Sequence, residues 1–244
     1  SIFINVDDTK YINRRGIFNF KIFEFKKILQ TLKENKISKL VFLGKINRPN
    51  LSDFKNDGII ENYLPLLVES FKKGDGNILS TVVKIFDQNG FRVLSPKKIS
   101  KNFFLSKAEI GSSINKNDKI DINKSIKILN ALSKYDNAQS IIIVDGYIIA
   151  IEAAEGTDNL IKRTVNIRKN LNQLNKKSGF LTKIPKKSQS KLIDLPVIGP
   201  KTIKLILKAN LRGIAINTKM TMIYKKTEFL KITNENDLRI YDLS

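Results

Sequence analysis

The chain has 244 residues, of which 41% are hydrophobic and 8% aromatic, enough for one large or two modest domains with a buried core. It contains no Cys and no His. This excludes disulfides, thiolate or imidazole metal sites and the Ser-His-Asp triad. Catalysis would have to use carboxylates, Lys or Arg, hydroxyls, backbone amides and a hard metal ion.

The formal net charge of +21 suits nucleic acid or an anionic membrane surface. However, eight of the 44 basic residues are Arg and the rest are Lys, whereas selected phosphate readers favour the bidentate fork of Arg. We interpret the excess of Lys as a coding bias and expect no nucleic-acid partner. No apolar stretch reaches the roughly 18–20 residues of a membrane span, and no signal-peptide pattern opens the chain, so we expect a cytoplasmic protein.

The first half alternates strand-like and helical patterns. Apolar runs predict strands at residues 2–6, 39–43 and 91–94, and helical spacing predicts helices over residues 21–34 and 74–87. Such alternation indicates an open, mostly parallel α/β sheet. The pattern dissolves into a stretch rich in Lys, Ser and Asn over residues 96–118, which we interpret as a boundary between domains 1–108 and 109–244.

The second half predicts another α/β domain, with a mixed sheet. Asp145-Gly146 separates two apolar runs and is typical of a type I′ hairpin. Pro200 suits the first turn of a helix. The expected strands are residues 141–144, 147–152, 213–217 and 220–224, and the expected helices are residues 121–134, 157–174 and one from residue 200.

Three acids lie close together in an acidic turn, residues 152–158, between a strand and a helix. They are Glu152, Glu155 and Asp158, with Gly156 and Thr157 between them. Carboxylates at a strand end beside a helix start can hold phosphates and hard cations such as Mg²⁺ or Mn²⁺. Alternatively, Thr157 or Asp158 only caps the helix. A cap does not need the other two acids, which favours the functional interpretation.

A second turn, residues 194–202, contains two prolines and a glycine that fix its shape. It starts at Asp194 and runs through Gly199 into a helix whose free N–H groups lie near Lys201 and Thr202. An anion could bind there, with Asp194 at the rim. The alternative is an ordinary loop with a surface aspartate.

Basic residues flank both turns and could contact phosphates or an anionic bilayer, although most belong to a solvated face. We assign ligand contacts only to Arg163 and Lys201. The full set is Lys183, Lys186, Lys187, Lys191, Lys201, Arg163 and Arg168.

In the first half, two further loops follow expected strands or segments, where ligands bind in open sheets. Neither matches a Walker A or GxGxxG pattern. Their candidate residues are Gly44, Lys45, Arg48, Gly74 and Asp75.

Together these turns resemble the LpxI family of UDP-2,3-diacylglucosamine pyrophosphatases. The resemblance is carried by residues 141–163, 179–185, 194–200 and 213–215, and less specifically by residues 44–49 and 74–76. It implies a two-domain α/β protein, with an N-terminal Rossmann-like open parallel sheet, that binds its ligand between the domains. The family normally has a further strand, glycine-rich turn and helix ahead of residue 2, so we expect the first βα unit to be missing.

The resemblance implies hydrolysis of UDP-2,3-diacylglucosamine to UMP and 2,3-diacylglucosamine 1-phosphate in lipid A biosynthesis, with Mg²⁺ or Mn²⁺. It also implies peripheral contact with the cytoplasmic face of the inner membrane, and a homodimer is a possible assembly. A binding protein for the nucleotide-sugar lipid without catalysis, or a basic nucleic-acid-binding module, are the alternatives.

The resemblance places the chemistry on both turns, which we expect to converge on one diphosphate and its cation. Asp194, Asp158 and Glu155 are the expected catalytic residues, and Glu152, Glu155, Asp158 and Asp194 the expected metal ligands. The expected substrate-binding residues are Gly44, Lys45, Arg48, Gly74, Asp75, Gly156, Thr157, Arg163, Gly199, Lys201 and Thr202.

Overall fold

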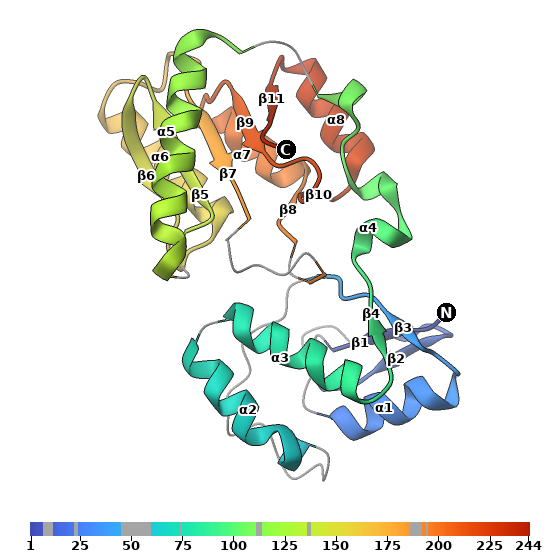
Figure 1. Ribbon diagram of the computed structural model, residues 1–244. Helices are drawn as coiled ribbons and strands as arrows, with labels where there is room; N and C mark the ends of the chain where they lie inside the picture. Colours follow the sequence, from blue (N-terminus) through green and yellow to red (C-terminus); the bar gives the residue numbers. More distant parts are fainter. Residues whose placement is uncertain are drawn as a thin grey trace. The chain divides into compact units, whose positions relative to one another are not determined.

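The computed structural model describes residues 1–6, 12–21, 24–44, 60–73, 75–110, 114–135, 138–185, 192–193 and 195–244. The chain separates into two compact units (Figure 1). The first holds Ser1–Lys98 and a short later segment that includes Leu192 and Ile193, and the second holds Ile99–Gln189 and Leu195–Ser244. From the sequence we expected the division after residue 108.

The second unit is built on a five-stranded sheet, in the order β11-β9-β7-β5-β6, within the described residues. Its strands are β5 (Ser140–Val144), β6 (Tyr147–Ile151), β7 (Phe180–Lys183), β9 (Gly213–Ile216) and β11 (Arg239–Asp242). β7, β9 and β11 run parallel, and β5 is antiparallel to both its neighbours. The predicted mixed sheet is therefore confirmed. The carboxyl ends of β6, β7, β9 and β11 share one edge with the start of β5.

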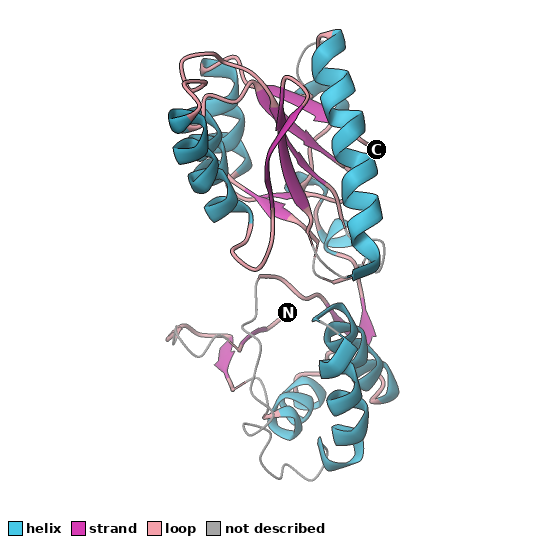
Figure 2. Ribbon diagram, turned by 90° about the vertical axis from the view of Figure 1, so that its left-hand side faces the viewer, coloured by secondary structure: helices cyan, strands magenta, loops and turns pink. Residues whose placement is uncertain are grey.

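Helices cover both faces of this sheet (Figure 2): α5 (Lys116–Leu132), α6 (Thr157–Asn170), α7 (Pro200–Lys208) and α8 (Lys226–Glu235). Side chains alternate between the faces along each strand. Ile142 and Leu181 belong to one core cluster with Leu160 of α6, whereas Ile141 packs with Leu129 of α5. Burying each of these aliphatic side chains contributes roughly 1.5–3 kcal/mol. The sheet is therefore stabilised by a hydrophobic core on each of its two faces.

The predicted hairpin is confirmed. Asp145 and Gly146 have φ angles of 48° and 84°, which a type I′ turn requires at both central positions. The backbone N–H of Gly146 donates to Asp121 Oδ1 at 2.9 Å. The turn is therefore anchored to α5 as well as closed by its own geometry.

Among its described residues, the first unit contains two short parallel strand pairs, β1 (Phe3–Asn5) with β2 (Ile17–Asn19) and β3 (Lys39–Leu40) with β4 (Arg92–Val93). The helices of this unit are α1 (Phe25–Glu34), α2 (Ile60–Lys73) and α3 (Asp75–Gln88). The short α4 (Pro96–Ile99) lies at the boundary, with Ile99 in the second unit. The ring of Phe86 lies 5.3 Å from Phe25 and 5.5 Å from Phe42, centroid to centroid. This unit is thus α/β, as expected, and its Rossmann-like character stays a prediction.

Several elements were not predicted from the sequence. α2 carries Pro65 in its interior, which argues against a helix in a sequence pattern. β7, β11 and α8 were also missed, as was β8 (Val197–Ile198), which pairs in parallel with β10 (Met222–Ile223). Among the described residues, no helix has both the length and the apolar character needed to cross a membrane.

Candidate active site

The acidic turn follows β6 at the carboxyl edge of the sheet, as predicted, and leads into α6. Gly156 is the N-cap of α6 with φ of 77°, a left-handed conformation that glycine adopts without strain. Thr157 is the first residue of the helix. The three carboxylates of the turn bind different partners.

Glu152 belongs to a group of polar side chains at the sheet edge, which we call the edge cluster: Ser140, Glu152, Thr157 and Lys183. Ser140 and Lys183 are buried, and Glu152 and Thr157 are partly buried. Lys183 Nζ donates to Thr157 Oγ1 at 2.7 Å and to Ser140 Oγ at 3.3 Å. Thr157 Oγ1 donates to Glu152 Oε1 at 3.2 Å, and Glu152 Oε2 lies 4.0 Å from Lys183 Nζ. The edge cluster therefore joins the end of β7, the start of β5 and the first turn of α6.

Glu155 is held by Arg163 of α6. Arg163 Nη2 donates to Glu155 Oε1 at 2.7 Å and to the carbonyl of Ile151 at 3.0 Å. The Arg163 hydrogen bond lowers the pKa of Glu155, and the backbone N–H of Ala153 adds to this effect. This pair ties the acidic turn to α6, and substrate contact by Arg163 stays a prediction.

Asp158 joins the starts of two helices. Its Oδ1 accepts from Thr202 Oγ1 at 2.9 Å, and its Oδ2 lies 3.0 Å from Lys201 Nζ. α7 begins at Pro200 with Gly199 as its N-cap, so the amino ends of α6 and α7 meet through Asp158. Each helix start carries unpaired N–H groups and a partial positive charge. The structure thus brings together Asp158, Lys201 and Thr202, which the sequence predicted as parts of one site.

Several predicted site residues lie outside the described residues: Lys45, Arg48, Gly74, Asp194, Lys186, Lys187 and Lys191. Gly44 follows β3 with φ of 94°, and Asp75 is the first residue of α3. Convergence of Asp194 with the acidic turn therefore stays a prediction.

The three described acids of the acidic turn point to separate partners and not to one common point. In the part of the chain that the structure describes, no three Asp or Glu side chains gather as ligands for one ion. Glu152, Glu155 and Asp158 each bind a different basic side chain. They do not fit a single carboxylate cage. Mg²⁺ usually takes one or two carboxylates together with substrate phosphates, so a smaller site that includes Asp194 stays a prediction.

Arg168 was grouped from the sequence with basic residues that could contact phosphate or belong to a solvated face, and it does neither in the structure. Its side chain is fully buried. Its guanidinium donates to the carbonyls of Gln173, Lys176, Ser178, Ala209 and Asn210. Because backbone groups take these donors, Arg168 stabilises the second unit and is not exposed to a ligand.

Ser140 was missed by the sequence analysis, and Lys183 was seen only as one of many surface lysines. Lys183 is in fact 6% exposed. The available signal was its position after Phe180-Leu181-Thr182, in which Phe and Thr are residue types that favour strands, and which follows Gly179. In a strand its side chain points to the same face as Leu181, which is the face covered by α6.

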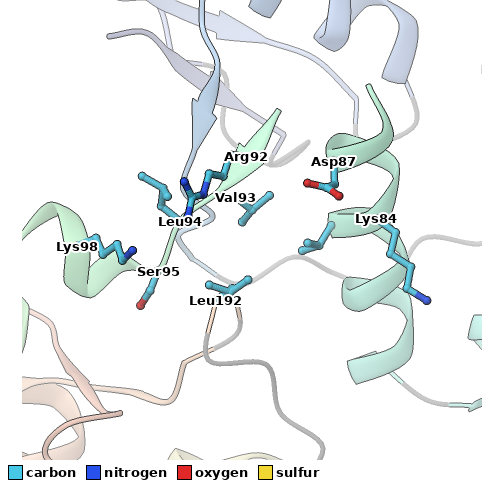
Figure 3. A pocket seen from close by; sticks show the side chains of 9 residues that line it. Lys84, Asp87, Arg92, Val93, Leu94, Ser95, Lys98 and Leu192 are labelled. Carbon is cyan, nitrogen blue, oxygen red and sulfur yellow. The ribbon is translucent and has the colours of Figure 1, made fainter. Parts of the chain in front are cut away.

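The first unit has a separate pocket of about 380 Å³ at the carboxyl end of β4 (Figure 3). Its charged lining is Lys84, Asp87, Arg92 and Lys98, and its apolar lining includes Leu192. Three cations against one carboxylate favour an anionic ligand. Gly44, the described residue of the predicted loop after β3, is not among the lining residues.

Comparison with known proteins identifies the family. Residues 107–241 match the family model described as the LpxI C-terminal domain, and residues 5–103 match the LpxI N-terminal domain. The chain is 29% identical over 193 residues to the protein named UDP-2,3-diacylglucosamine pyrophosphatase LpxI of Caulobacter vibrioides, covering 78% of this chain and 69% of that protein. With both of its domains represented, the chain belongs to the LpxI family.

Proposed function

We propose that this chain hydrolyses the pyrophosphate bond of UDP-2,3-diacylglucosamine in lipid A biosynthesis. Water adds across one P–O bond of the diphosphate, which yields UMP and 2,3-diacylglucosamine 1-phosphate. Membership of the LpxI family supports the substrate and the reaction. The observation that carries the site is the meeting of the α6 and α7 starts at Asp158.

In this proposal the two helix starts bind the diphosphate. Their N–H groups are directed donors that complement the phosphate oxygens without reorganisation. Lys201 has a side chain that is 75% exposed, so it can turn from Asp158 to a phosphate oxygen. Loss of that ion pair leaves an Asp158 oxygen available to orient the attacking water and accept its proton.

We also propose a requirement for Mg²⁺ or Mn²⁺, for which Asp158 and Asp194 are the candidate ligands. The ion would neutralise phosphoryl oxygens. If so, EDTA abolishes UMP release and added Mg²⁺ restores it. Activity that survives exhaustive chelation contradicts the metal requirement and leaves the hydrolase proposal intact.

The acylated substrate implies contact with the cytoplasmic face of the inner membrane. The net charge of +21 supports peripheral binding, since each Lys near an anionic surface contributes about 1 kcal/mol. The chain should then sediment with phosphatidylglycerol vesicles and not with phosphatidylcholine vesicles. A homodimer, which sedimentation velocity would detect, also stays a prediction.

The experiment that tests the reaction is UMP release from UDP-2,3-diacylglucosamine by the purified chain with Mg²⁺, compared with Asp194→Ala. We expect turnover by the unsubstituted chain and loss with Asp194→Ala. Tight substrate binding without turnover would favour the non-catalytic alternative. Salt-sensitive duplex binding that UDP does not compete with would favour the nucleic-acid alternative.

A further inference from the structure

Lys183 occupies an unusual place for a lysine. It is the last residue of β7, between β5 and β9, and is 6% exposed. Lysine is almost never buried unless it is paired, because removing an ammonium from water is costly. Its partners include Thr157, Ser140 and Glu152, which belong to the first turn of α6, the start of β5 and the acidic turn.

The hydrogen bonds of the edge cluster assign a direction to the hydroxyl proton of Thr157. Lys183 has only donors, so Thr157 Oγ1 accepts from it at 2.7 Å and gives its own proton to Glu152 Oε1. Ser140 Oγ also accepts from Lys183 and lies 3.2 Å from Thr157 Oγ1, to which it can donate. The ammonium therefore determines how the first side chain of α6 is held.

The charge of Lys183 explains why Glu152 lies at this position. Its Oε2 is buried without a hydrogen-bond partner and lies 4.0 Å from Lys183 Nζ. A buried ammonium requires a nearby negative charge. A carboxylate already facing an ammonium is a poor second ligand for a divalent cation, since the two cations repel each other. Glu152 is thus better explained as the counter-charge of Lys183 than as a metal ligand.

We propose that Lys183 is a positioning residue of the reaction, with Glu152 as its counter-ion. By holding Thr157, Lys183 fixes the first turn of α6 against the sheet edge, so that its N–H groups and Asp158 face the diphosphate. This inference rests on the proposed function of the same site. It removes Glu152 from the predicted metal ligands and gives Lys183 and Ser140 a role.

The test compares Lys183→Met with Thr157→Val, with the double variant and with the matched control Lys204→Met. Lys204 lies on α7, beyond its first turn, and forms an exposed ion pair with Glu228 of α8. We expect Lys183→Met to lower kcat for UMP release about 100-fold, as misplaced catalytic groups do, with a smaller change in KM. Thr157→Val should give a similar loss, and the double variant no more than either single variant, because both break one interaction. Lys204→Met should not change kcat.

A second readout separates positioning from a purely structural role and does not need turnover. Calorimetric titration with inorganic pyrophosphate should show affinity about tenfold weaker for Lys183→Met, equivalent to about 1.4 kcal/mol, in protein that circular dichroism shows to be folded. Lys183→Arg, which keeps the charge, should recover part of both losses.

The outcomes are distinguishable. Unchanged kcat and unchanged pyrophosphate affinity in folded Lys183→Met overturn the inference. So does a loss of activity that merely follows the unfolded fraction while Thr157→Val is harmless. If the unsubstituted chain releases no UMP, the proposed function fails, and the pyrophosphate titration still decides the role of Lys183.

The role of Glu152 has its own test, which is the affinity for Mn²⁺. Equal Mn²⁺ affinity in Glu152→Gln and the unsubstituted chain supports Glu152 as a counter-ion, and loss of Mn²⁺ binding contradicts it.

Discussion

Two buried basic side chains, Arg168 and Lys183, lie at opposite edges of the sheet in the second unit, and they bind different kinds of partner. Arg168, near the end of α6, donates to backbone carbonyls that precede β7 and β9. Lys183, at the end of β7, donates to side-chain hydroxyls and faces a carboxylate. Both side chains are more than nine-tenths buried.

This difference indicates that the two edges of the sheet have different roles. The edge at the amino ends of β7 and β9, which we call the amino edge, is structural, and the edge at their carboxyl ends, the carboxyl edge, is functional. Backbone carbonyls are fixed by the chain and cannot rearrange without local unfolding. Hydroxyls and carboxylates can rotate or exchange partners when a ligand binds. In open α/β sheets, ligands bind at the carboxyl ends of strands, which is the edge of Lys183. Substitutions at the amino edge should therefore change stability, and those at the carboxyl edge should change activity.

The largest expected effect is at the amino edge. Arg168→Met leaves five carbonyls without their donor and should lower the free energy of unfolding of the second unit by about 3–5 kcal/mol. Urea unfolding followed by circular dichroism measures this. Arg163→Met is the control, since its ion pair is exposed and should contribute at most about 1 kcal/mol. Equal losses in the two variants would remove the distinction between the edges.

At the carboxyl edge, Asp158→Ala should lower kcat/KM for UMP release about 100-fold, comparable to the loss of one preorganised polar group. The urea midpoint should fall only modestly, because the Lys201 partner is exposed and the lost hydrogen bond from Thr202 is worth about 1 kcal/mol. Glu228→Ala, which removes an exposed carboxylate from α8, is the control. A variant that turns over normally would show that the meeting of the helix starts is only structural.

A smaller effect is expected on the pH dependence of stability, through the carboxyl group of Glu155. Its pKa lies below the ordinary value of 4.5, first because Arg163 donates to it. A lowered carboxyl pKa adds stability above the unfolded value, and this stability is lost as the pH falls through the folded value. Below pH 4.5, the unfolding free energy of the unsubstituted chain should therefore fall more steeply than that of Glu155→Gln. Parallel pH curves would contradict this assignment.

The smallest effect is expected at Asp121. Burial raises its pKa, and the charges of Asp145 and Asp118 add to the shift. Folding therefore favours the protonated form, and the stability it contributes is lost as the pH rises through the folded value. Asp121→Asn keeps an oxygen to accept from Gly146 and should be slightly more stable than the unsubstituted chain at pH 7, with the difference disappearing in acid. Lower stability at pH 7 would contradict this.

The sequence predicted elements whose signals are local. The Asp145-Gly146 hairpin, the start of α6 at Thr157 and the start of α7 at Pro200 are all confirmed. It missed elements that depend on their neighbours. Among the described strands, β11 pairs with β9 alone. The sequence of α8 is weakly amphipathic, and its apolar residues identify a helix only once Phe229 is seen to pack in the core.

The candidate site, like the fold, was predicted from the sequence only where its signals are local. Composition and spacing identified the acidic turn and the helix start at Lys201 and Thr202, and the structure joins them at Asp158. The sequence alone did not distinguish Lys183 from the other lysines or Arg168 from a phosphate contact. Their burial follows from long-range strand order and from loops far away in the chain.

The central claim is that the diphosphate binds at the starts of α6 and α7. Hydrogen–deuterium exchange with and without UDP, which carries the diphosphate without the lipid, tests it most directly. We predict slower exchange of backbone amides over residues 156–160 and 201–203, with little change over residues 172–178 and 209–212 at the opposite edge. Protection confined to the opposite edge, or absent from both helix starts at saturating UDP, would contradict the claim.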